Sequence, residues 1–234
     1  MGDLKYNGQR AENAITLIWT VLTVELISLV SYYFQYDLLQ TIVDGGTVTG
    51  EAAKENDLIN REINIISTIV HISSAVTFIM WFRRACHNLS LTPSCLQYHE
   101  HWTVGCWFVP LINLFKPYQI MKDMYGKTAE LLGKNEINTG NLLSLNLIGW
   151  WWALWIASNI IAYFSMQYMR DANTVDSLIF VTKAYMIAHA ATVISAFVTI
   201  RVIGNYSRVE LLLQKINSSE TVGITDSPFK TQTS

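Results

Sequence analysis

Four hydrophobic segments constrain this chain most strongly, because each is long enough to cross the hydrocarbon core of a bilayer, which takes about 20 mostly apolar residues. Each segment holds a few polar residues and no cluster of charges. The predicted spans are residues 14–34, 63–82, 147–168 and 178–203. Charged residues make up 15% of the chain, against roughly 25% in soluble domains. We therefore predict an all-α membrane protein whose transmembrane domain, residues 14–205, consists of four helices.

A fifth apolar stretch lies between the second and third spans, at residues 102–119. Pro110 and Pro117 prevent this stretch from forming one continuous helix. Irregular backbone at membrane depth is tolerated only where protein or a cavity covers it. The sequence therefore predicts a Pro-broken insertion at residues 102–121, partly embedded in the membrane on its cytoplasmic side.

The positions of Lys and Arg predict the orientation. Twelve of the sixteen precede the first span, lie between the second and third spans, or lie from Arg201, at the end of the fourth span, onward. Because short cytoplasmic segments are enriched in Lys and Arg, residues 1–13 and the C-terminal tail are expected to be cytoplasmic. We expect a multi-pass protein of the inner (plasma) membrane, with both termini in the cytoplasm.

The tail, residues 206–234, contains Val209, Leu212, Leu213 and Ile216 at helical spacing. This pattern predicts a short amphipathic helix on the inner membrane surface. The polar, Ser/Thr-rich composition from Asn217 onward predicts a disordered end.

Tryptophans cluster where the second span ends and where the third begins. They are Trp81, Trp150, Trp151, Trp152 and Trp155. Trp is enriched at the membrane–water interface, often with Lys or Arg just beyond it. We interpret these side chains as an aromatic belt at the headgroup level.

Several motifs in the central region resemble a known family. They are Trp81-Phe82-Arg83-Arg84, Trp102-x-Val104-Gly105-x-Trp107-Phe108-Val109-Pro110, Asn113-Leu114-Phe115-Lys116-Pro117-Tyr118-Gln119 and Trp151-Trp152-Ala153-Leu154-Trp155. Together they resemble the bacterial integral membrane family known as domain of unknown function 4328, over about residues 63–205. Tyr98-His99-Glu100-His101 stands where the family has a Pro-Gly-like turn. The family has no established activity, so the resemblance implies an architecture and transfers no catalytic residue.

Three ionisable residues are predicted to lie at similar depth near the membrane midplane. They are Glu25 in the first span, His71 in the second and His189 in the fourth, placed by a rise of about 1.5 Å per residue. Such residues are costly in a membrane and usually face the bundle interior with a partner. The favoured interpretation is a hydrogen-bonded layer that fixes helix register. The alternatives are a proton or ion relay, as in a small transporter or proton-coupled protein, and a haem site that uses the two histidines.

Basic and aromatic residues around the insertion form a second candidate site. It consists of Arg83, Arg84, Trp102, Trp107, Lys116, Tyr118 and Lys122. Basic residues beside aromatics at the inner interface suit anionic lipid headgroups. The alternative is ordinary anchoring under the positive-inside rule. Membrane lipids, and a protein on the cytoplasmic side, are the partners that this site suggests.

Other function classes have little support in the sequence. The net charge of -2 argues against nucleic acid. Cys86, His87, Cys95, His99, His101 and Cys106 lack the spacing of a structural zinc site, so we predict no metal site, and no cofactor beyond the haem alternative. Phosphate-binding, nucleophile-elbow and zinc-protease motifs are missing. The favoured function is a non-enzymatic membrane module that binds lipid or a partner, of open oligomeric state.

Overall fold

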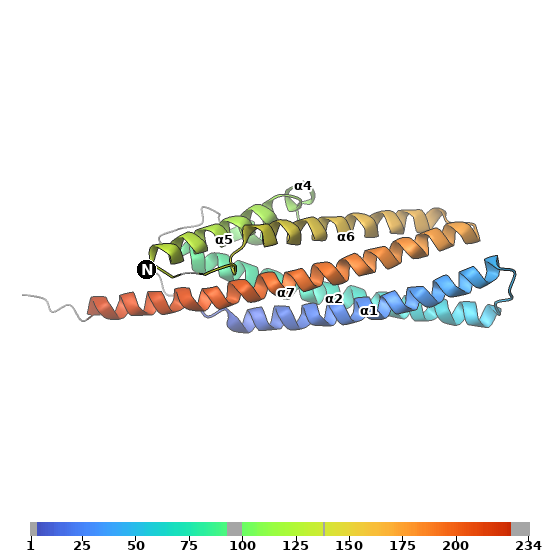
Figure 1. Ribbon diagram of the computed structural model, residues 1–234, viewed down its shortest axis with the longest axis horizontal. Coiled ribbons are helices and arrows are strands. Elements are labelled where there is room, and N and C mark those ends of the chain that lie inside the picture. Colours follow the sequence, from blue (N-terminus) through green and yellow to red (C-terminus); the bar gives the residue numbers. More distant parts are fainter. Residues whose placement is uncertain (1–3, 93–99, 138, 226–234) are drawn as a thin grey trace, which may run out of the picture.

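The computed structural model describes residues 4–92, 100–137 and 139–225, and these residues form helices and no strands. Figure 1 shows an elongated bundle of nearly antiparallel helices. The helices are α1 (Gly8–Val43), α2 (Gly50–Ser90), α3 (Glu100–Gly105), α4 (Pro110–Asn113), α5 (Lys116–Lys134), α6 (Leu145–Asp171) and α7 (Val175–Thr225).

Four of these helices are long and apolar enough to cross a membrane, as predicted. They are α1, α2, α6 and the Val175–Gln214 part of α7. Each helix extends beyond the span predicted for it, because polar residues continue the helix where the apolar run ends. At the start of α2, for example, the Thr49 hydroxyl accepts a hydrogen bond from the Ala52 amide and caps the helix. The chain therefore has the architecture of a multi-pass integral membrane protein.

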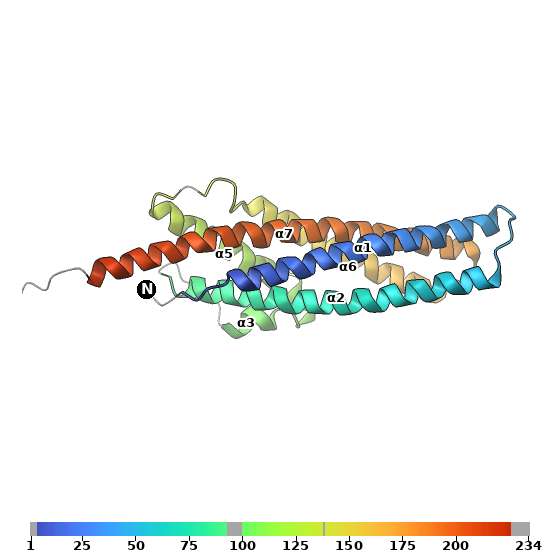
Figure 2. The ribbon, with the colours of Figure 1, turned by 90° about the horizontal axis from the view of Figure 1, so that it is seen from below.

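The long helices pack in the order α2, α1, α7, α6, since α1 contacts α2 and α7, and α6 packs on α7. At one end of the bundle α5 contacts both α2 and α6 and so joins the two outer helices of this row. The chain begins at that end, and α7 runs past the other helices there (Figures 1 and 2). We call it the terminal end. The opposite end, with the α1–α2 and α6–α7 connections, is the loop end.

The densest packing lies in the terminal half of the bundle. Trp81, Phe82, Met121, Tyr125 and Ile203 are all completely or almost completely buried there. The Tyr125 hydroxyl donates to the Val202 carbonyl at 2.6 Å, and burial raises the pKa of Tyr125 well above its ordinary value. This half therefore holds α2, α5 and α7 together.

Most of the predicted aromatic belt belongs to this core, so that interpretation was wrong for three of its residues. Trp81, Trp151 and Trp152 are 0%, 2% and 8% exposed. Only Trp150 is well exposed, at 69%. The reason is that Trp81 and Trp151 contact Tyr206 and Thr199 of α7, and Trp152 donates to the Leu114 carbonyl in the insertion.

The insertion consists of short helical pieces whose boundaries coincide with its prolines. Helix α4 begins at Pro110, and Pro117 lies in the first turn of α5. Proline is tolerated in a first turn because the amide that it lacks would have no helical partner there. The prolines thus separate α4 and α5 from the preceding chain. Whether a membrane surrounds this segment stays a prediction.

The predicted tail is corrected by the structure, because α7 continues without interruption to Thr225. No separate surface helix begins at residue 206. Ile203, Tyr206, Val209 and Leu213 are all buried, and their spacing of three to four residues continues the face that α7 already packs. The tail is amphipathic as predicted, but its apolar face packs against protein. The predicted disorder from residue 217 is wrong as far as Thr225, and residues 226–234 lie outside the described part.

A buried polar group of residues, the terminal cluster, ties the N-terminal segment to α2 and α7. Glu210 is 4% exposed, and its carboxylate accepts hydrogen bonds from Asn7 Nδ2 at 3.0 Å and Asn88 Nδ2 at 2.7 Å. Asn88 also bonds both the amide and the carbonyl of Lys5, at 3.1 and 2.7 Å. Three separate parts of the chain therefore meet at one carboxylate.

Candidate functional site

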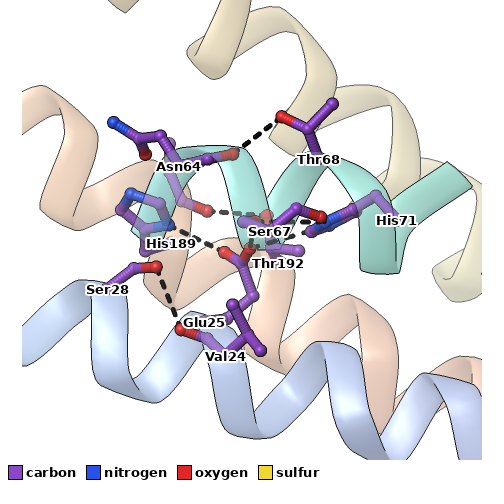
Figure 3. A network of polar contacts seen from close by, with 10 residues as sticks. Val24, Glu25, Ser28, Asn64, Ser67, Thr68, His71, His189 and Thr192 are labelled. Carbon is purple, nitrogen blue, oxygen red and sulfur yellow. Dashed lines mark hydrogen bonds and ion pairs between the residues drawn. The ribbon is translucent and has the colours of Figure 1, made fainter. Parts of the chain in front are cut away.

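The structure brings together the three ionisable residues predicted for the midplane. Glu25 of α1 points between α2 and α7, where it meets His71 and His189 (Figure 3). Glu25 is 3% exposed. The three side chains come from three helices and share one depth, as their distances from the helix ends predict.

His189 holds one oxygen of the carboxylate. Its Nδ1 lies 2.8 Å from Glu25 Oε2, and its ring packs against Tyr32 with 5.1 Å between centroids. Its Nε2 is buried and has no hydrogen-bond partner among the described residues. The imidazole is therefore fixed on one side and unsatisfied on the other.

His71 and Ser67 hold the other oxygen. The His71 Nδ1 lies 2.9 Å from the Ser67 carbonyl oxygen, and because a carbonyl only accepts, this nitrogen carries a hydrogen. The His71 Nε2 lies 3.6 Å from Glu25 Oε1, and the Ser67 hydroxyl donates to the same oxygen at 3.2 Å. A neutral His71 thus turns a lone pair toward the carboxylate.

The geometry would allow these three side chains to share one proton. With Glu25 ionised and both imidazoles neutral, the site carries a charge of −1. A proton on Glu25 or on His71 Nε2 would neutralise the site and place a donor opposite an acceptor across the 3.6 Å contact. A net charge at the centre of a span costs about 3 kcal/mol or more. The gain or loss of such a proton would therefore change the electrostatic energy of the bundle by a similar amount.

The site opens into a cavity of about 710 Å³, the midplane cavity. All four long helices line it, and Trp107 of the insertion lines it as well. The side chain of His71 is 42% exposed, whereas that of His189 is 14% exposed. His71 is thus the more exposed of the two imidazoles.

The geometry does not favour the haem alternative. The Glu25 carboxylate lies between the two imidazoles and engages both. A bis-histidine haem would have to displace it, since the iron must lie between the ligating nitrogens. Within the described ranges no three His, Cys, Asp or Glu side chains form a group that could hold a metal ion. Of the six Cys and His residues weighed for zinc, Cys95 and His99 lie outside the described residues.

The residues of the predicted lipid interface separate into two groups. Trp102, Lys116 and Lys122 are exposed, as is Arg83, while Arg84 and Tyr118 are half-buried. Trp107 differs from the prediction because its ring faces the interior. It packs edge-on against Phe78, Phe82, Trp152 and Trp155, with centroids 5.5 to 6.3 Å apart. Trp107 therefore belongs to the cavity and not to the headgroup surface.

The insertion also presents exposed apolar side chains, which we call the insertion patch. Leu111, Phe108 and Phe115 are 77%, 73% and 64% exposed, and Leu114 and Val109 about 40%. The patch lies directly beside Lys116. An apolar tip with basic residues next to it has the composition of a segment that inserts among headgroups.

Several site residues were missed in the sequence, although their spacing carried a signal. Ser67 precedes His71 by four residues, and Tyr185 precedes His189 by four, so each pair shares a helix face. Tyr32 follows Glu25 by seven residues, which again returns to the same face. A search for polar and aromatic residues at these spacings would have found all three.

Comparison with protein families gives one match. The family described as Domain of unknown function (DUF4328) matches residues 44–208. That region includes His71 and His189, and Glu25 lies outside it. No curated protein and no solved structure matches the chain.

Proposed function

The chain belongs to the DUF4328 family, and we propose that it is a small proton-coupled membrane transporter that holds its proton at Glu25, His71 and His189. The observation that carries this proposal is the pairing of both Glu25 oxygens with imidazoles at the wall of a cavity. Ionisable residues that face a cavity inside a membrane are typical of proton relays and transport paths.

A purely structural polar layer explains the site less well. Such a layer stabilises a bundle by pairing every donor and acceptor. Here the His189 Nε2 lacks a partner among the described residues, and His71 meets Glu25 through an acceptor unless a proton is added. A structural layer also needs no adjoining cavity. A site that exchanges a proton accounts for all three features.

A route from the loop end to the proton site supports the same function. A second cavity of about 720 Å³, the loop-end cavity, is lined by Asp57 and Arg61 among others. It shares Tyr32, Asn64 and Tyr185 with the midplane cavity. The terminal half is densely packed instead. The two adjoining cavities thus support access to the site from the loop end, as alternating access requires of one of its states.

The distribution of Lys and Arg supports an orientation for this transporter. We place it in the inner membrane with both termini and the insertion in the cytoplasm. The loop end then faces outward, so the route described above leads from outside to the midplane.

Infrared titration of the carboxyl group tests the proton site. In full-length protein in lipid nanodiscs, the C=O stretch of a protonated carboxylic acid is followed as pH is varied. We expect a titrating band that disappears in Glu25→Gln and persists in Glu62→Gln, an exposed carboxylate on α2 outside both cavities. If wild-type protein shows no titrating band that depends on Glu25, the proposed function is wrong.

The exposed insertion patch favours a second candidate function, the binding of anionic lipid. Besides Lys116, three arginines gather near this end. Arg10 donates to the Met80 carbonyl at 3.2 Å, and Arg83 and Arg84 lie close enough to repel its charge. An anionic headgroup relieves such repulsion. The patch would then place its apolar side chains among the acyl chains below.

Lipid retention in native mass spectrometry tests this candidate. The double variant Arg84→Ala/Lys116→Ala should retain less phosphatidylglycerol than wild type, with phosphatidylcholine unchanged. The matched control is Lys54→Ala/Arg170→Ala, which removes two exposed charges near the loop end. Equal retention in the two double variants would exclude the insertion as a headgroup site.

A further inference from the structure

The lining of the midplane cavity is acidic at its centre and aromatic at its terminal side. At the centre Glu25 is the only acid among the described lining residues, and none of these is Lys or Arg. Toward the terminal side the wall is formed by four aromatic rings, those of Phe78, Trp107, Trp151 and Trp155. A bound molecule would therefore meet a carboxylate and aromatic rings together.

The rings form one connected wall. Trp107 packs edge-on against Phe78 at 5.5 Å and against Trp155 at 6.3 Å, and Phe78 lies 6.0 Å from Trp151. The faces of aromatic rings carry partial negative charge and attract cations within about 6 Å of their centroids. Ring faces turned toward a bound molecule would thus favour the same sign of charge as the carboxylate.

The size and polarity of the cavity restrict the class of ligand further. A volume of about 710 Å³ lies within the roughly 300–1,000 Å³ typical of small-molecule sites. A metal ion would leave most of this volume empty. An anion would face the Glu25 carboxylate, and an uncharged polar molecule such as a sugar would leave that charge without a counter-ion. A cation with an apolar body fits both parts of the cavity.

We propose that the midplane cavity binds an amphipathic organic cation, which takes the place of the proton held by Glu25, His71 and His189. This inference rests on the proposed function and names its substrate class. The exchange balances in charge, because one monovalent cation enters as one proton leaves and the site remains neutral. Cation and proton therefore compete for a single negative charge, which couples their movements.

Binding of tetraphenylphosphonium to full-length protein in nanodiscs tests the proposal, with empty nanodiscs subtracted. Calorimetry in two buffers of different ionisation enthalpy measures the protons released. We expect saturable binding that weakens as pH falls, with about one proton released per cation. Tetraphenylborate, of the same shape and opposite charge, should not bind to the site. Saturable binding of both ions, or cation binding without proton release, would overturn the proposal.

Two pairs of variants assign the binding to this cavity. Glu25→Gln should weaken tetraphenylphosphonium binding at least tenfold and abolish proton release, and Glu62→Gln should change neither. Trp155→Leu should weaken binding about fivefold while the carboxyl band still titrates. The matched control is Trp150→Leu, because Trp150 is 69% exposed and does not line the cavity. Equal affinity of the two Trp variants would contradict the aromatic wall.

The failures of the two proposals are distinguishable. If the Glu25 band titrates but no cation binds to wild-type protein, the substrate class is wrong and the proton site stands. If the band is missing, both are wrong. Elution at the wild-type volume in gel filtration shows that each variant is folded, so loss of binding in a folded variant is attributed to the cavity.

Discussion

Replacement of Asn88 by alanine tests whether the terminal cluster holds the bundle together. Its side chain is 3% exposed and makes three hydrogen bonds, two with the Lys5 backbone and one with Glu210. A net contribution of about 1 kcal/mol for each neutral bond and about 2 for the bond to a carboxylate gives roughly 4 kcal/mol. Water that enters the vacated space replaces part of the lost hydrogen bonding. We therefore expect a loss of about 3 kcal/mol in the free energy of unfolding.

The assay is reversible unfolding in mixed micelles of mild detergent and dodecyl sulfate, followed by tryptophan fluorescence. Asn13→Ala is the matched control, because Asn13 is exposed and accepts one bond from Gln9. The loss in free energy of unfolding for Asn7→Ala should lie between those of Asn88→Ala and Asn13→Ala. Asn7→Ala removes a bond to Glu210, but it also removes a buried Oδ1 that has no partner among the described residues. If Asn88→Ala costs no more than Asn13→Ala, the terminal cluster does not stabilise the fold and our reasoning is wrong.

Two further predictions concern the insertion and the orientation. Trp107→Ala should lower the free energy of unfolding by about 3 kcal/mol, because it removes a ring from a packed aromatic group. Phe108→Ala, at a position 73% exposed, should change this free energy by less than about 0.5 kcal/mol. Equal losses for the two variants in the same unfolding assay would contradict the inward placement of Trp107. In a Cys95→Ser background, a membrane-impermeant thiol reagent added to intact cells should label Thr47→Cys, in the α1–α2 connection, and leave Thr139→Cys, which precedes α6, unlabelled. The reverse pattern would invert the orientation and make the loop end cytoplasmic.

The four spans and the depth of the polar residues were predictable because both follow from helix geometry. A bilayer fixes the length of an apolar run, and a constant rise per residue fixes the depth of Glu25, His71 and His189. Which helices are neighbours does not follow from either quantity. Glu25 meets His189 because α1 packs against α7, and that pairing depends on side-chain fit along both helices.

The misplaced tryptophans and tail share one cause. A Trp or an amphipathic stripe near a membrane surface has the same local pattern whether lipid or protein covers it. Trp81 is followed at four-residue intervals by Ala85 and Leu89, and all three are completely buried. That continuation of one helix face past the end of the apolar run indicated a protein neighbour. The tail shows the same continuation on α7 from Ile203 to Leu213.

The insertion and the polar site line the same cavity, although they are separate features in the sequence. Trp107 lies between α3 and α4, and its ring lines the midplane cavity on the terminal side. The backbone on either side of it is short and interrupted, with α4 beginning at Pro110. This ring packs on Phe78 and Phe82 of α2 and on Trp152 and Trp155 of α6, so it fills the space between these two helices. The broken element that suggested a lipid-facing segment therefore also supplies part of the wall of the cavity that holds Glu25.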